Sequence, residues 1–107
     1  MNLVEDYCSK EVRNLLVTKG FIGDMWYNND DIHISHALAM KWLREKGVYL
    51  NIRIVLNRME DDVINNIHWV VDILDFNSGE WKDNDIWTDT YEEAVEAALK
   101  YALENLI

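Results

Sequence analysis

The segment that most constrains the fold is residues 88–107, which read TDTYEEAVEAALKYALENLI. Thr90 and Glu93 form a capping box, in which the hydroxyl accepts from the Glu93 amide and the carboxylate reaches back to the Thr90 amide. A helix is therefore predicted to begin at Thr90. Because alanines are prominent on its apolar face, we expect this helix to lie close against a flat surface such as a sheet. The residues of that face are Val95, Ala98, Leu99, Ala102 and Leu106.

The opposite face of this helix is charged. Glu92, Glu96, Lys100 and Glu104 follow one another at four-residue steps, so neighbouring side chains can interact along the helix surface. This pattern predicts a solvated stripe.

Two shorter helices are predicted in the first half of the chain. Ser9 caps the first helix, which ends at Gly20, and Ser35 caps the second, which covers residues 36–46 and ends at Gly47. The residues expected to face the core are Val12, Leu15 and Leu16 in the first helix and Ala39, Met40, Leu43 and Trp42 in the second.

Two long segments alternate between apolar and polar residues with the period of a strand. The first runs from Tyr49 to Asn57 and the second from about Ile67 to Phe76. We expect the two apolar rows to pair and to receive the C-terminal helix; they are Leu50, Ile52, Ile54 and Leu56, and Ile67, Trp69, Val71 and Ile73. This order of elements favours an α+β fold, a small antiparallel sheet with two to three helices packed on it.

Shorter segments complete the predicted fold. Turn-rich residues 28–31 between two β-prone triplets favour a small hairpin over residues 25–34. The acidic stretch from Arg58 to Asn66 is expected to be an exposed loop. Either Trp81 or the pair Ile86 and Trp87 is expected to form a last short strand after a turn at residues 77–79.

Composition limits the class of protein. The 107 residues predict one domain, 1–107, and the net charge of −10 disfavours binding to nucleic acid. Proline is absent and glycine numbers four, so no flexible linker is expected. The single cysteine, Cys8, allows no intrachain disulfide, and no segment has the pattern of a signal peptide or a membrane span. A cytoplasmic protein without membrane contact is the prediction.

Sequence spacing identifies no catalytic, metal or cofactor site. His33 and His36 flank the predicted cap Ser35 and need not share a face, and no familiar local signature of a nucleophilic cysteine surrounds Cys8. Asp75 and Asn77 begin like a calcium loop, but Glu80 and Ile86 break that pattern. An alternative hypothesis is a small-ligand binder or an enzyme, in which one of His33, His36 and His68 meets a carboxylate and a tryptophan in a pocket.

The unusual feature of the composition is its aromatic content, with five tryptophans and five tyrosines. Trp26, Tyr27, Trp81 and Trp87 come from short irregular segments and are predicted to be partly exposed binding residues. Such rings are equally common as a lid over the core of a small domain. The predicted partner is an unidentified protein, and a homodimer is a second prediction.

Three segments of the chain also resemble a known group of proteins. They are residues 8–12 (CSKEV), 35–45 (SHALAMKWLRE) and 91–107 (YEEAVEAALKYALENLI), and the group consists of short proteins of gut Bacteroidetes-type bacteria, their phages and mobile elements. The group has no established activity to transfer. The resemblance implies an accessory protein of a bacterium or its phage. The tryptophan excess, together with the missing catalytic motifs, favours a protein-binding or regulatory module. A further alternative is an acidic nucleic-acid mimic that uses the carboxylates of residues 60–62 and 83–96.

Overall fold

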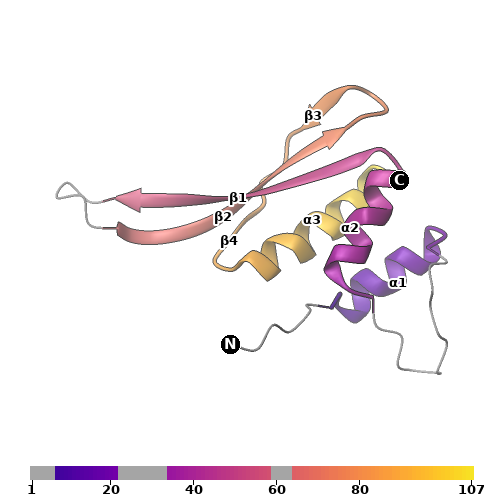
Figure 1. Cartoon of the computed structure of the whole chain (residues 1–107), viewed down its shortest axis with the longest axis horizontal. Helices are drawn as coiled ribbons and strands as arrows, with labels where there is room; N and C mark the ends of the chain where they lie inside the picture. Colours follow the sequence, from indigo (N-terminus) through magenta and orange to yellow (C-terminus); the bar gives the residue numbers. More distant parts are fainter. Residues whose placement is uncertain (1–6, 22–33, 59–63) are drawn as a thin grey trace.

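The structure is a computed structural model that describes residues 7–21, 34–58 and 64–107. Within these residues all strand pairs are antiparallel, and the three helices lie on one side of the four-stranded sheet (Figure 1). The predicted α+β class, with the C-terminal helix against the sheet, is confirmed. In chain order the elements are α1 (Lys10–Thr18), α2 (His36–Glu45), β1 (Val48–Arg58), β2 (Ile64–Asp75), β3 (Glu80–Lys82), β4 (Trp87–Thr88) and α3 (Tyr91–Asn105).

Each helix begins at the residue that the sequence predicted. The hydroxyls of Ser9, Ser35 and Thr90 accept from the backbone amides three residues later, at 3.2, 3.1 and 3.1 Å. These bonds satisfy amides that have no partner within the helix. In α3 the Glu93 carboxylate accepts from the Thr90 hydroxyl at 3.1 Å, in place of the predicted bond to the Thr90 amide.

The two apolar rows of the long hairpin pair, as predicted. Leu50 lies opposite Ile73, Ile52 opposite Val71, Ile54 opposite Trp69 and Leu56 opposite Ile67. Directly opposed residues of an antiparallel pair point to the same face, so the two apolar rows form one continuous surface on the inner side of the sheet.

Only part of this inner surface is buried, which corrects the prediction that the helix covers both rows. Val71 and Ile73 are buried, whereas Ile54, Leu56 and Ile67 are 47%, 39% and 44% exposed. The cause is a difference in length. The 12 residues of β2 span about 40 Å, whereas the 15 residues of α3 span about 22 Å. Tyr91, the first residue of α3, packs on Trp69 with ring centroids 5.4 Å apart, and the hairpin extends past this point (Figure 1).

The two segments that were alternatives for the last strand each contain a strand. β3 pairs Trp81 with Leu74, and β4 pairs Trp87 with Val70. Between them the side-chain amide of Asn84 donates to the Val71 carbonyl at 3.2 Å, which takes the place of a strand partner for that carbonyl. This interruption is why two short strands, and not one long strand, line β2.

The long strands also extend further than predicted. β1 continues to Arg58 and β2 already begins at Ile64, so both ends of the segment predicted as a loop, Arg58 to Asn66, lie in strands. Residues 59–63 lie outside the described part of the chain, as does most of the hairpin predicted over residues 25–34.

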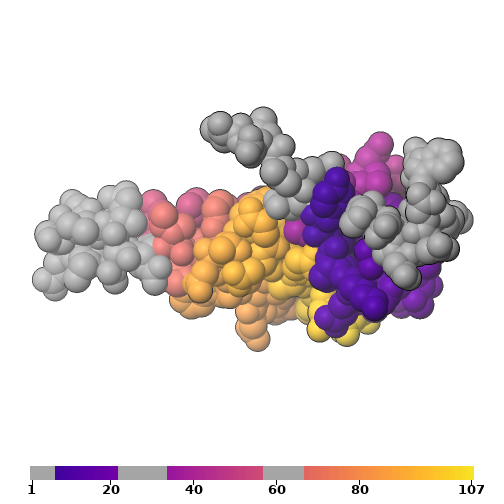
Figure 2. All heavy atoms as spheres, turned by 90° about the horizontal axis from the view of Figure 1, so that it is seen from below, coloured from indigo at the N-terminus to yellow at the C-terminus, as the bar shows by residue number. Residues whose placement is uncertain are grey.

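The core is centred on α3. This helix contacts β1, β2, β4, α1 and α2, and α1 lies beside it on the face seen in Figure 2. On the other helices Leu16 and Leu43 are fully buried, and the ring of Phe21 packs edge-on against Trp42 at 5.8 Å. The fully buried residues of α3 are Ala94, Val95, Ala98, Leu99, Ala102 and Leu103. Within the described ranges, no helix combines the length and the hydrophobicity that crossing a bilayer requires.

The turn from α2 into β1 depends on Gly47, which has a left-handed φ of 87°. A Cβ at this position would lie 2.8 Å from the Asn77 side-chain nitrogen, which donates to the Lys46 carbonyl at 3.0 Å. We expect Gly47→Ala to lower the free energy of unfolding by about 2–3 kcal/mol, since the strained backbone costs about 1–2 kcal/mol and the Asn77 bond is displaced. Urea unfolding of the native protein and the variant measures this difference in the free energy of unfolding.

Gly79→Ala is the matched control. Gly79 has a similar φ of 73°, but a Cβ there meets no atom within 4 Å, so only the backbone cost applies. Equal losses in the two variants would contradict a role for the Asn77 contact.

Candidate functional site

The first candidate site is the face of the sheet turned away from the helices, here called the outer face. Strand alternation places Tyr49, Asn51 and Arg53 of β1 on this face, together with Val70, Asp72 and Leu74 of β2. Trp81 lies opposite Leu74 and Trp87 opposite Val70, so both tryptophans share the outer face. All described helices lie on the other side of the sheet (Figure 1).

The outer face exposes several large aromatic rings. Trp81 is 63% exposed and Trp87 is 61% exposed. Phe76, just after β2, is 69% exposed and packs edge-on against Tyr49, with ring centroids 6.2 Å apart. The structure therefore places two of the four predicted binding residues on one exposed surface, and their binding role remains a prediction.

The other predicted binding residues, Trp26 and Tyr27, lie outside the described residues. Sequence reasoning missed Tyr49 and Phe76, because both were read as ordinary strand residues. The alternation of β1 contained the available signal, since it places Tyr49 on the face opposite Leu50.

The centre of the outer face is polar. One oxygen of Asp72 accepts from Arg53 Nε at 2.8 Å and from the side-chain amide of Asn51 at 3.4 Å. Beside this group a cavity of about 510 Å³ is lined by Asn51, Asp72 and Trp81, and by residues of the segment after β3. The outer face thus combines exposed rings with oriented donors and acceptors.

His68 lies near one end of the outer face. Its ring packs edge-on against Trp87 at 4.5 Å, and its Nδ1 lies 3.6 Å from an Asp89 oxygen. A histidine, a tryptophan and a carboxylate therefore meet, as the small-ligand hypothesis requires. However, Asp89 is largely exposed, and His68 lines neither the cavity beside Trp81 nor the cavity beside α3 described below. The contact between the His68 and Trp87 rings therefore serves to hold Trp87 in place on the outer face.

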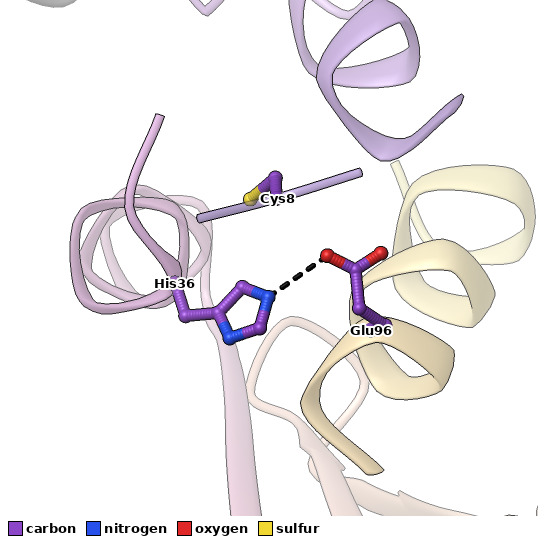
Figure 3. A group of neighbouring side chains, drawn as sticks. All are labelled: Cys8, His36 and Glu96. Atoms are coloured by element: carbon purple, nitrogen blue, oxygen red, sulfur yellow. Dashed lines mark hydrogen bonds and ion pairs between the residues drawn. The ribbon is translucent and has the colours of Figure 1, made fainter. Parts of the chain in front are cut away.

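The second candidate site is a cluster of Cys8, His36 and Glu96 on the helical side (Figure 3). Cys8 precedes α1, His36 is the first residue of α2, and Glu96 comes from the middle of α3. His36 Nε2 and Glu96 Oε1 lie 2.8 Å apart, and the Ser9 amide donates to the same oxygen at 2.7 Å. The Cys8 amide donates to the Ile34 carbonyl at 2.8 Å, which holds the segment before α1 against the segment before α2.

Glu96 corrects the prediction of a solvated stripe on α3. Its side chain is only 26% exposed, because the N-terminal ends of α1 and α2 both approach it. A carboxylate is favourable at such ends, where backbone amides carry partial positive charge. Periodicity within α3 could not reveal this contact, since it depends on two helices that are distant in sequence. His33, the other member of the predicted pair, lies outside the described residues.

Cys8 is not placed to act as a nucleophile. Burial, and secondarily the negative charge of Glu96, raises the pKa of its thiol from 9.0 to about 12. The thiolate is the reactive form, so this thiol is inert near neutral pH. The sulfur lies 3.9 Å from the Ser35 carbonyl, and the Nε2 of His36 is already engaged by Glu96.

No protein-family model matches the chain, and neither a curated protein nor a solved structure matches it. Function is therefore inferred from the geometry of these two sites.

The hydrogen bonds to Glu96 give a direct test of the cluster. Glu96→Ala leaves the Ser9 amide and His36 Nε2 without their partner, which should lower the free energy of unfolding by about 2–3 kcal/mol. Glu92→Ala, one turn earlier on the exposed surface, should cost less than about 1 kcal/mol. If the two variants lost the same free energy of unfolding in urea, the prediction that Glu96 belongs to a solvated stripe would be correct.

The buried thiol predicts a dependence on pH. Because the folded-state pKa of Cys8 is raised above its unfolded value of 9.0, its contribution to stability is complete below pH 9 and is lost as the pH rises toward 12. Relative to Cys8→Ala, the native protein should therefore lose stability over this range. At pH 7 the folded chain should react with Ellman's reagent far more slowly than the urea-unfolded chain, and equal rates would show an accessible thiol.

Proposed function

We propose that the protein is a small protein-binding module of a bacterium or its phage, which acts in the cytoplasm and contacts its partner through the outer face. The observation that carries the proposal is that Trp81 and Trp87, each more than 60% exposed, share a sheet face that the described helices leave open. Exposed apolar patches of this kind mark interaction sites, and tryptophan is enriched among the residues that dominate binding energy.

The sheet supports this proposal because it holds the rings in place before binding. Trp81 and Trp87 sit on strands paired with β2, Tyr49 and Phe76 pack on each other, and His68 packs on Trp87. A rigid surface loses little conformational entropy when a partner docks. The Arg53–Asp72 pair between the rings adds a polar contact that only a complementary partner would satisfy.

The charge of the protein favours a partner with a basic rim. The chain carries a net charge of −10, and Asp83, Asp85 and Asp89, which follow β3 and β4, are exposed. Lysine and arginine side chains around an apolar centre would complement this arrangement and accelerate association.

The nucleic-acid mimic is a second candidate. It is favoured by the exposed carboxylates that continue from Asp83 and Asp85 through Asp89 to Glu92 and Glu93. The two candidates differ in their response to salt. A mimic held by many charge pairs loses its partner between low and high salt, whereas binding through buried rings persists.

Site-specific crosslinking tests the proposed surface. We expect a benzoylphenylalanine at position 81 or 87 to crosslink one partner protein in a lysate of gut Bacteroidetes cells, the setting that the sequence resemblance implies. The control position is 38, because Leu38 is 40% exposed on α2, on the helical side. Crosslinking at 38 alone, or at no position, would contradict the proposal.

Substitution of the rings gives the energetic test. Trp81→Ala and Trp87→Ala should each weaken capture of the crosslinked partner roughly 30-fold, corresponding to about 2 kcal/mol, if these rings are central to the interface. Stability should change little, since both rings are more exposed than buried. Light scattering distinguishes a second copy of this chain from a different protein as the partner.

A further inference from the structure

We propose that Cys8, His36 and Glu96 bind a zinc ion. The site lies on the helical side of the sheet and does not depend on the proposed role of the outer face. Its members come from three separate elements, and their ligand atoms lie within 4.8 Å of one another (Figure 3).

The spacing of the three ligand atoms suits one small ion. Zinc bonds of about 2.0–2.3 Å in a tetrahedral site place ligand atoms about 3.3–3.8 Å apart. Here His36 Nε2 and Glu96 Oε1 are 2.8 Å apart, and one ligand atom from each of the three residues lies within 4.8 Å of the other two. Side-chain rotations that shift these atoms by about 1 Å convert one spacing into the other.

The chemistry of the three ligands selects the metal. Calcium and magnesium take oxygen ligands, whereas a set of thiolate sulfur, imidazole nitrogen and carboxylate oxygen is typical of zinc. Three protein ligands leave the fourth tetrahedral position to water, as in zinc sites that are not closed by protein.

Charge balance favours the bound ion. Zinc deprotonates a coordinated thiol outright, so binding releases the Cys8 proton to solvent and forms an S–Zn bond. The double positive charge of the ion is then matched by one thiolate and one carboxylate. Without the ion, Cys8 and His36 face the negative charge of the Glu96 carboxylate in the interior. With the ion bound, the cluster as a whole is neutral.

A path to the site is present. A cavity of about 520 Å³ reaches His36 and Glu96 and is also lined by Glu11, Glu92 and Glu93. The one lysine among its lining residues, Lys100, is paired with Glu11 at 2.8 Å. Carboxylates around a cavity raise the local concentration of cations.

One ring nitrogen of His36 has no partner in the described part of the chain. The ring is buried, and among the described residues its Nδ1 has no hydrogen-bond partner. A buried polar atom without a protein partner is uncommon, and many such atoms bind an ion or an ordered water. Zinc on Nε2 fixes the ring proton on Nδ1, so the bound state has a defined tautomer, although the ion itself does not pair with Nδ1.

Metal titration of the full chain tests the site. We expect one Zn²⁺ per chain in competition with a chromophoric chelator. The Co²⁺-loaded protein should show a thiolate-to-cobalt charge-transfer band and the intense visible bands of a tetrahedral ion. Cys8→Ala and Glu96→Gln should each weaken binding at least about 100-fold, since even residues behind the ligands change metal affinity 10–100-fold.

The controls separate this site from surface carboxylates. Glu92→Gln removes a charge from the same cavity without removing a ligand, and His68→Gln removes a distant histidine, so both should retain the cobalt spectrum. Absence of binding, an octahedral cobalt spectrum without the charge-transfer band, or equal affinity in folded Cys8→Ala would each overturn the proposal. The cobalt spectrum needs no variant, and circular dichroism establishes that each variant is folded.

Discussion

The close approach of α3 to its surroundings is the contact on which the rest of the structure depends. Ala94, Ala98 and Ala102 repeat at four-residue steps and are fully buried, so the helix axis can lie near neighbouring backbone. From this position α3 contacts the sheet, α1 and α2. The same approach brings Glu96 to the starts of two other helices, which is how a residue in the middle of one helix becomes the centre of a polar cluster.

The sheet and the helices differ in length, and this difference divides the molecule into two kinds of surface. Where α3 covers the hairpin, Val71 and Ile73 form a dry core, and beyond Tyr91 the same apolar row meets solvent. The outer face stays open along its described length because the helices lie on the other side. The exposed apolar residues are therefore concentrated in two places: the inner row beyond Tyr91 and the outer face.

Local chemistry explains which features could be predicted from the sequence. The caps at Ser9, Ser35 and Thr90 and the pairing of the two apolar rows follow from neighbouring residues and from strand period, so sequence analysis identified them. The extent of burial along the hairpin and the environment of Glu96 depend on how far and where separate elements meet. For the site, exposure of Trp81 and Trp87 was predictable from their short segments, whereas the meeting of Cys8, His36 and Glu96 was not.

The bond from the Ser9 amide to Glu96 joins residues 87 positions apart. α1 packs on α3, so its buried side chains Val12 and Leu16 lack this helix as a packing partner until α3 has been synthesised. Contacts between such distant segments slow folding, because a long loop must close before they form. The hairpin and α2 are neighbours in sequence and can associate early in synthesis, whereas α1 gains its contacts with α3 only after residues 91–105 have been added.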